Sequence, residues 1–272
     1  MESDRDLLVK AKGGDRRALD TLLRKHEPKV FRFGLRMCGD EEAAREVLQR
    51  TLLTAFEQLG TFREDAQLST WLYSIARSFC SRHHRRTRSA PLHDVALDAP
   101  GGDQALPPAE DLDPESKVAQ AEIAELLGAA IAALPDAYRE VVVLRDVEGL
   151  SAEEASAVIG IGVPALKSRL HRGRQMLKAH LAALLREEGR SVGGVQACGG
   201  LAKELEGLAD QELDQNACAA IEEHVRGCRP CAATLGKLQE TAALCSRLPK
   251  GEVPEPVQRA VRSALLDALG GG

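Results

Sequence analysis

An acidic, proline-rich stretch divides the chain and limits what each part can fold into. Residues 89–115 carry seven Asp or Glu, no Lys or Arg, and five of the twelve prolines. This composition shows no helical periodicity and cannot bury enough apolar surface to form a core. We therefore expect a linker here, with separate folding units on either side.

The formal net charge of −5 conceals an uneven distribution along the chain. Residues 1–88 carry 18 Lys or Arg against 13 Asp or Glu, residues 116–190 are balanced, and residues 191–272 carry 8 against 11. Taken alone, an acidic total argues against a nucleic-acid partner. The basic first segment removes that objection, because the acidic charge is concentrated elsewhere.

The length of 272 residues fits two or three domains. We expect a helical module at 1–88, the linker at 89–115, a second helical module at 116–190 and a Cys-bearing module at 191–272. No apolar run approaches the roughly 18 residues of a membrane span. The N-terminus MESDRDLLVKAKGGD is too charged for a secretory signal, so a cytoplasmic chain without a membrane partner is expected.

Helical spacing of apolar residues dominates the first module and predicts an all-α fold. The pattern covers residues 15–36 and 41–59 and resumes near residue 69. The third of these segments ends in the basic run RSFCSRHHRRTR. A solvated helix end explains such a run about as well as a nucleic-acid contact does.

The second module contains a helix-turn-helix pattern. Ser151 and Glu154 form a capping box before a short helix. Gly160 to Val163 make a tight turn, and Pro164 suits the first turn of the next helix. Gly160 is also small where two helices must cross, which completes the pattern.

The second helix of this pattern is basic, with no acidic residue between Val163 and Glu187. A recognition helix needs this arrangement, since its first residues read base edges while basic side chains hold phosphates. The alternative is an amphipathic core helix with a solvated basic face. The capped first helix, the glycine turn and the acid-free second helix together favour DNA binding.

These motifs resemble region 4 of the extracytoplasmic-function (ECF) sigma factors, which are bacterial transcription initiation factors. The residues that carry the resemblance are Leu134-Pro135, Tyr138-Arg139, Leu144-Arg145-Asp146, Leu150-Ser151, Glu154, Gly160 and Lys167 to Arg172. Region 4 reads the −35 promoter element. The resemblance implies DNA contacts from Ala165, Leu166, Lys167, Ser168, Arg169, His171, Arg172 and Arg174.

The first module resembles region 2 of the same family. The stretch Glu46 to Thr51 is similar to the segment that holds the polymerase clamp helices, although Glu46 stands where Asp is usual. Phe62 and the run LSTWLYSIAR resemble the segment that opens and reads the −10 element. The implied polymerase contacts are Glu46, Gln49 and Arg50, and the implied −10 contacts are Phe62, Arg63, Glu64, Asp65, Trp71 and Arg77. The resemblance implies the RNA polymerase core and promoter DNA as partners, with no small-molecule substrate and no enzyme activity.

The third module contains the spacing Cys198-x25-His224-x3-Cys228-x2-Cys231. His224 and Cys228 share a helix face, and the CxxC brings two thiolates to one point. One imidazole and three sulfurs suit tetrahedral zinc, or another thiophilic metal such as copper or cadmium. A buried Cys pair or a redox CxxC is the competing interpretation.

This segment is similar to the zinc-associated anti-sigma domain, here fused to the sigma factor. It is also similar to the Cys-rich tails of sigma factors that sense copper, cadmium or zinc. Cys198 is assigned to the first ligand position, where that domain often has His. Cys218 and Cys245 remain alternatives as fourth ligand, redox thiol or core residue, whereas packing accounts for Cys38 and Cys80 in the first module.

The last apolar stripe follows Pro254 and Pro256. Val257, Val261 and Leu265 lie at helical spacing, so this segment either docks on the sigma modules or closes its own domain. We expect a sigma factor regulated in cis by a metal-binding or redox-sensitive C-terminal module. The alternatives are a helix-turn-helix repressor with a zinc-dependent dimerisation domain, and a CxxC enzyme, for which no acid/base constellation is present.

Overall fold

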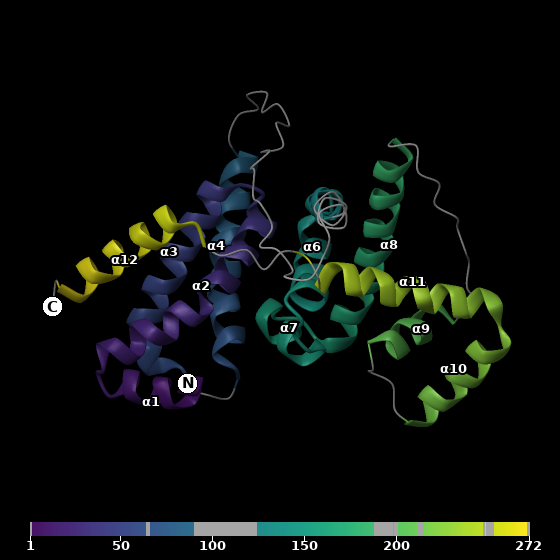
Figure 1. Cartoon of the computed structure of the whole chain (residues 1–272), viewed down its shortest axis with the longest axis horizontal. Coiled ribbons are helices and arrows are strands. Elements are labelled where there is room, and N and C mark those ends of the chain that lie inside the picture. Colours follow the sequence, from purple (N-terminus) through teal and green to yellow (C-terminus); the bar gives the residue numbers. More distant parts are fainter. Residues whose placement is uncertain are drawn as a thin grey trace, which may run out of the picture.

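The computed structural model describes residues 2–63, 66–89, 124–187, 198, 201–210, 215–246, 248 and 253–270. Every regular element in these ranges is a helix, which confirms the predicted all-α class (Figure 1). None of the described helices is long and apolar enough to span a membrane. The predicted linker lies almost entirely outside the described residues.

The first module is a bundle of four helices. They are α1 (Asp4–Lys12), α2 (Arg16–Cys38), α3 (Glu41–Gln58) and α4 (Leu68–Ser89), with the 3₁₀ turn η1 (Leu59–Thr61) after α3. The side chains of Ser3, Asp15 and Asp40 cap the first three helices by accepting backbone N–H bonds. Gly39 adopts φ 86° between α2 and α3, a conformation that glycine permits and that lets the two helices fold back on each other.

The second module contains the predicted helix-turn-helix. A helix at 124–132 precedes α6 (Asp136–Val142), the π-helical turn η2 (Val143–Val147), α7 (Ala152–Ile159) and α8 (Val163–Glu187). The capping box of Ser151 and Glu154 is present as predicted. A Cβ at Gly160 would meet no atom within 4 Å, so the expectation of a close crossing there is wrong. Gly160 instead supplies the left-handed backbone at φ 76° that ends α7.

The close crossing lies thirteen residues further on, at Gly173. A Cβ there would lie 2.9 Å from Val142 Cγ2 and 3.3 Å from the Tyr138 carbonyl oxygen. The absence of a side chain therefore lets α8 approach α6 closely. This approach fixes the direction in which the recognition helix leaves the module.

Four helices follow in the C-terminal third. They are α9 (Ala202–Ala209), α10 (Gln215–Gly227), α11 (Arg229–Ser246) and α12 (Glu255–Gly270). The first three share a small core of Leu205, Ile221, Cys231 and Leu238.

The end of the C-terminal third packs on the first and second modules. In Figure 1, α11 reaches the second module, where it packs on η2, and α12 lies along α3 of the first module. The apolar residues that join the core shared by these two modules are Cys245, Leu248, Val253, Val257, Val261 and Leu265.

Candidate promoter-facing surfaces and metal site

Most of the residues expected to contact the −35 element lie on the accessible side of α8. Ala165, Lys167, Ser168 and Arg172 are exposed, and Arg169 and His171 are half-buried. Leu166 and Arg174 differ from that expectation, because both side chains face the protein interior. Leu166 packs in the apolar core, so it holds α8 in place instead of presenting a surface to DNA.

Arg174 is held by two carboxylates from different parts of the chain. Its Nε and Nη2 donate to Asp146 at 3.0 and 2.5 Å, and its Nη1 and Nη2 donate to Asp210 at 2.8 Å each. Burial works to lower the pKa of Arg174, but the two carboxylates outweigh it and raise the pKa. The charged guanidinium therefore joins α8 to η2 and to the residue that follows α9.

The residues expected to read the −10 element are partly packed. Phe62 is buried against Trp71, with ring centroids 5.0 Å apart, and its carbonyl oxygen accepts a 2.7 Å bond from Lys12 Nζ. Arg63 is exposed. Glu64 and Asp65 lie outside the described residues.

One carboxylate pairs with an arginine from each of the first two modules. Arg77 of α4 donates from Nε to Glu140 Oε2 at 2.7 Å and from Nη2 to Oε1 at 3.3 Å. Arg169 of α8 lies 4.0 Å from the same Oε1. Glu140 is itself buried in α6. Two arginines expected to contact different promoter elements thus share one buried carboxylate.

A second buried contact joins the same two modules. Glu148 follows η2, and its side chain is 2% exposed; its Oε2 accepts a 2.7 Å bond from the Tyr73 hydroxyl and lies 3.2 Å from Arg32 Nη2. Burial and the neighbouring carboxylate raise the pKa of Tyr73, which stays a hydrogen-bond donor. Arg139 of α6 adds a 2.9 Å bond to the carbonyl oxygen of Met37 at the end of α2.

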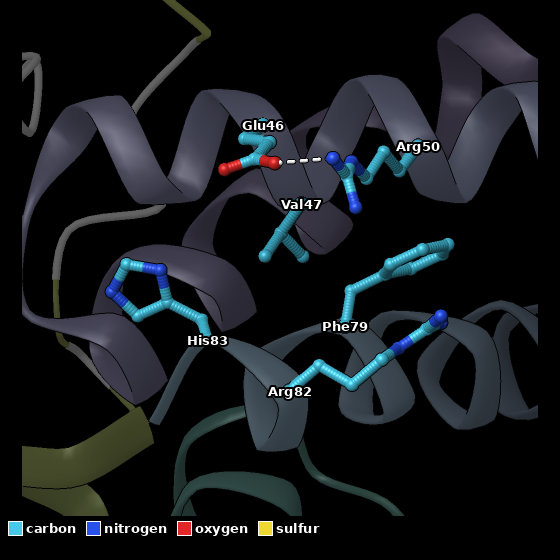
Figure 2. Close-up of a pocket in the computed structure, with 6 residues that line it drawn as sticks. All are labelled: Glu46, Val47, Arg50, Phe79, Arg82 and His83. Atoms are coloured by element: carbon cyan, nitrogen blue, oxygen red, sulfur yellow. Dashed lines mark ion pairs between the residues drawn. The ribbon is translucent and has the colours of Figure 1, made fainter. Parts of the chain in front are cut away.

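The expected polymerase contacts lie on α3 beside a shallow hollow. Glu46 and Arg50 are exposed and paired at 2.7 Å, and Gln49 is half-buried. Figure 2 shows this pair above the side chains of Phe79 and His83, with Arg82 4.3 Å from the Phe79 ring centroid. The hollow is lined by Glu46, Val47, Arg50, Phe79, Arg82 and His83.

The structure brings the four expected metal ligands together. The ligand atoms of Cys198, His224, Cys228 and Cys231 all lie within 4.8 Å of one another. The Sγ atoms of Cys198 and Cys228 are 3.5 Å apart, and His224 Nε2 lies 3.3 Å from Cys231 Sγ. Sulfurs at about 2.3 Å from a tetrahedral zinc ion are separated by roughly 3.8 Å, so the arrangement fits such an ion.

Hydrogen bonds at the CxxC lower the pKa of one of its thiols. A backbone hydrogen bond at Cys231 and the thiol of Cys198 lower the pKa of Cys228. The other two candidate ligands lie elsewhere: Cys218 is half-buried on α10, and Cys245 is fully buried in the core shared by the sigma modules. Burial raises the pKa of Cys245 to about 12. Geometry thus selects Cys198 as the fourth member of the cluster.

A helical chain with a capped helix-turn-helix and a basic second helix defines a class, the DNA-binding transcription proteins. Comparison with protein families refines it: residues 22–90 match sigma-70 region 2, and residues 124–177 match sigma-70 region 4. These two matches cover both helical modules in the expected order.

Curated relatives extend over both modules. The RNA polymerase sigma-H factor of Pseudomonas aeruginosa is 36% identical over 190 residues, which cover 68% of this chain and 97% of that protein. The ECF RNA polymerase sigma factor SigW of Bacillus subtilis is 30% identical over 183 residues, covering 65% and 96%. The chain therefore belongs to the ECF sigma factors of bacterial RNA polymerase.

Among solved structures, one of CnrH in complex with the cytosolic domain of CnrY is 24% identical. It covers 67% of this chain and 99% of that chain, with a TM-score of 0.49. A co-crystal structure of the sigma factor RpoE with the anti-sigma factor NepR from Bartonella quintana is also 24% identical. It covers 60% and 95%, with a TM-score of 0.45.

Family membership settles the coarse function. Sigma factors direct RNA polymerase to promoters, bind the polymerase core and promoter DNA, and are not enzymes. Membership of the sigma factor family therefore replaces the two alternative interpretations, a helix-turn-helix repressor and a CxxC enzyme. The relatives leave about a third of this chain outside their alignments.

Proposed function

We propose that this sigma factor is regulated in cis, with its C-terminal module keeping the two promoter-reading modules closed against each other. One observation carries the proposal: the C-terminal segment contacts both modules. Asp210 binds Arg174 of α8, and α12 packs on α3. A segment that contacts both modules favours the arrangement in which they lie together.

The packing of α12 on α3 supports a restraint exerted by the C-terminal module. The helix lies on α3, which also carries the expected polymerase contacts Glu46, Gln49 and Arg50, although Glu46 and Arg50 stay exposed beside it. Val257, Val261 and Leu265 are buried. Burying each of these side chains contributes about 1.5–3 kcal/mol, so polymerase must offset several kcal/mol to displace the helix.

The carboxylate of Glu140 supports the same direction. In the closed arrangement it occupies Arg77 and lies beside Arg169, which a promoter would otherwise engage through its phosphates and bases. On opening, the two arginines would exchange the carboxylate of Glu140 for the phosphates of the promoter. The C-terminal module thus sets how often the arginines are available.

The proposal includes a metal as the signal. Cys198, His224, Cys228 and Cys231 would hold zinc or another thiophilic metal, which stabilises the small core of Leu205 and Ile221 around them. That core supports α9, whose end positions Asp210. Occupation of the site by a metal would then strengthen the bond between Asp210 and Arg174, and loss of the metal would weaken it.

Transcription in vitro tests the cis regulation. The chain is shortened after Arg190, which leaves a length similar to that of the matched relatives, and is compared with the full chain on the same core polymerase and promoter. We expect the shortened chain to be active at lower concentration than the full chain. Equal activity at every concentration would contradict regulation by the C-terminal module.

Metal analysis tests the site separately. Purified full-length protein should carry about one equivalent of zinc or a related metal, and Cys228→Ser should lose most of it. Cys218→Ser is the matched control, because Cys218 lies on α10, the helix that carries His224, but outside the four-residue cluster. Retention of metal by Cys228→Ser, or equal loss in the control, would rule out the assigned ligands.

A further inference from the structure

Two cysteines of the first module face each other across its helices. Cys38 is the last residue of α2, and Cys80 lies in α4. Their Sγ atoms are 3.4 Å apart, with Cys38 half-buried and Cys80 buried. Packing explains why each is partly or fully covered, but it does not require the two sulfurs to be neighbours.

We propose that Cys38 and Cys80 form a reversible redox modification site, which hydrogen peroxide converts to a disulfide and a thiol reductant restores. A disulfide requires an S–S distance of about 2.0 Å, so the sulfurs must approach by roughly 1.4 Å. Side-chain rotation supplies a movement of this size. The site lies in the first module and does not depend on the C-terminal cluster or on the cis regulation proposed above.

Accessibility determines the order of the chemical steps. Cys38 is the thiol that an oxidant reaches; its sulfur attacks a peroxide oxygen, the O–O bond breaks, and a sulfenic acid and one water form. The sulfur of Cys80 then attacks the sulfur of Cys38. The S–S bond forms, the S–O bond breaks, and the hydroxide leaves with the proton of Cys80 as a second water. Two thiols lose two electrons, which the peroxide accepts.

The environment of Cys80 suits the second role. Its hydrogen bond with Cys38 and its burial raise the pKa of Cys80, and the burial shields it from the oxidant. The raised pKa slows the attack of Cys80 on Cys38, and the 3.4 Å separation of the two sulfurs compensates by holding them together. A buried thiol beside a reachable one is the arrangement of a resolving cysteine. Cys80 therefore reacts with its neighbour instead of being oxidised further.

The bond would affect the junction between the modules. The residue before Cys38 is Met37, whose carbonyl oxygen accepts the 2.9 Å bond from Arg139 of α6 and lies 2.7 Å from His84 Nε2 of α4. A disulfide would fix the end of α2 to α4 at the point where the second module is attached. Oxidation should therefore also raise the temperature at which the first module unfolds.

Peptide mapping of the full chain tests the pairing. Trypsin separates the two cysteines into the peptides 37–45 and 78–82. After treatment with hydrogen peroxide and alkylation of remaining thiols, we expect these peptides joined, with two hydrogen atoms less than their sum, and separated again by a reductant. Recovery of both peptides as alkylated thiols, or of either cysteine paired with a different partner, would overturn the proposal.

Variants distinguish the bond from a general effect of oxidation. Peroxide should raise the unfolding temperature of the full chain by several degrees, and Cys38→Ser should abolish that rise. Cys38 is half-buried, so this variant is expected to fold; Cys218→Ser is the control and should keep the rise. The same rise in Cys38→Ser as in the unaltered chain would overturn the proposal.

Discussion

At the scale of single residues, the position of Glu140 is the most informative feature. Its carboxylate is buried, binds Arg77 through two hydrogen bonds and lies 4.0 Å from Arg169. A buried carboxylate is retained only when cations or donors compensate for its desolvation. The two arginines compensate the buried charge of Glu140 in the arrangement seen here. The proposed opening would remove that compensation.

Removing the charge of Glu140 should favour opening. We expect Glu140→Gln to lower the apparent Kd of the full chain for core polymerase by roughly tenfold, because the open arrangement becomes more populated. Titration of labelled protein with polymerase measures this. Glu125→Gln removes an exposed carboxylate in the same module and should leave the Kd unchanged. An unchanged Kd for Glu140→Gln would show that this carboxylate does not restrain the modules.

Sequence alone predicts the residues of local motifs and not their distant partners. The basic pattern of α8 correctly identifies Lys167 and Arg172 as exposed. It does not show that Arg174 is buried between Asp146 and Asp210, since the second carboxylate lies 36 positions away. Ion pairs of this kind depend on tertiary packing. Their partners lie at no fixed spacing in the sequence, so no local pattern predicts them.

At the scale of elements, the crossing of α6 and α8 depends on Gly173. We expect Gly173→Ala to destabilise the second module by about 1–3 kcal/mol, because its Cβ would meet Val142 and the Tyr138 backbone. Gly128→Ala is a matched control on the helix at 124–132, where a Cβ meets no atom within 4 Å. It should stabilise by about 0.5–1 kcal/mol.

Unfolding in urea, followed by the loss of helical signal, measures both free energies. A Gly173→Ala chain as stable as the unaltered chain would show that α6 and α8 can separate without cost. The sequence does not distinguish these two glycines, since both are preceded and followed by residues typical of helices. Only the position of the neighbouring helix assigns them different roles.

Local signals account well for the individual elements. The capping box at Ser151 and the turn at Gly160 are present as predicted, because both depend on residues close in sequence. The stripe of Val257, Val261 and Leu265 predicts a helix but leaves its partner open. An apolar helix face indicates that another part of the protein covers it. The pattern does not identify that part.

At the scale of the whole molecule, the contact between α12 and α3 is open to a direct test. Val261 is fully buried, and Val261→Asp should displace α12. We expect a larger radius of gyration by small-angle scattering and tighter binding to core polymerase. Ser263→Asp places the same charge on the exposed side of α12 and should change neither. A Val261→Asp chain as compact as the unaltered one would contradict this packing.

The covalent link between the C-terminal helices and the sigma modules has a consequence for dosage. A separate inhibitor binds according to its abundance, whereas α12 meets α3 within one chain, at an effective concentration that is about millimolar for short flexible connections. Dilution or a burst of synthesis cannot change the ratio of the two, which is always one to one. Under the proposed cis regulation, every newly made molecule would carry its own restraint, and polymerase, a ligand or a covalent change would have to release it on that same molecule.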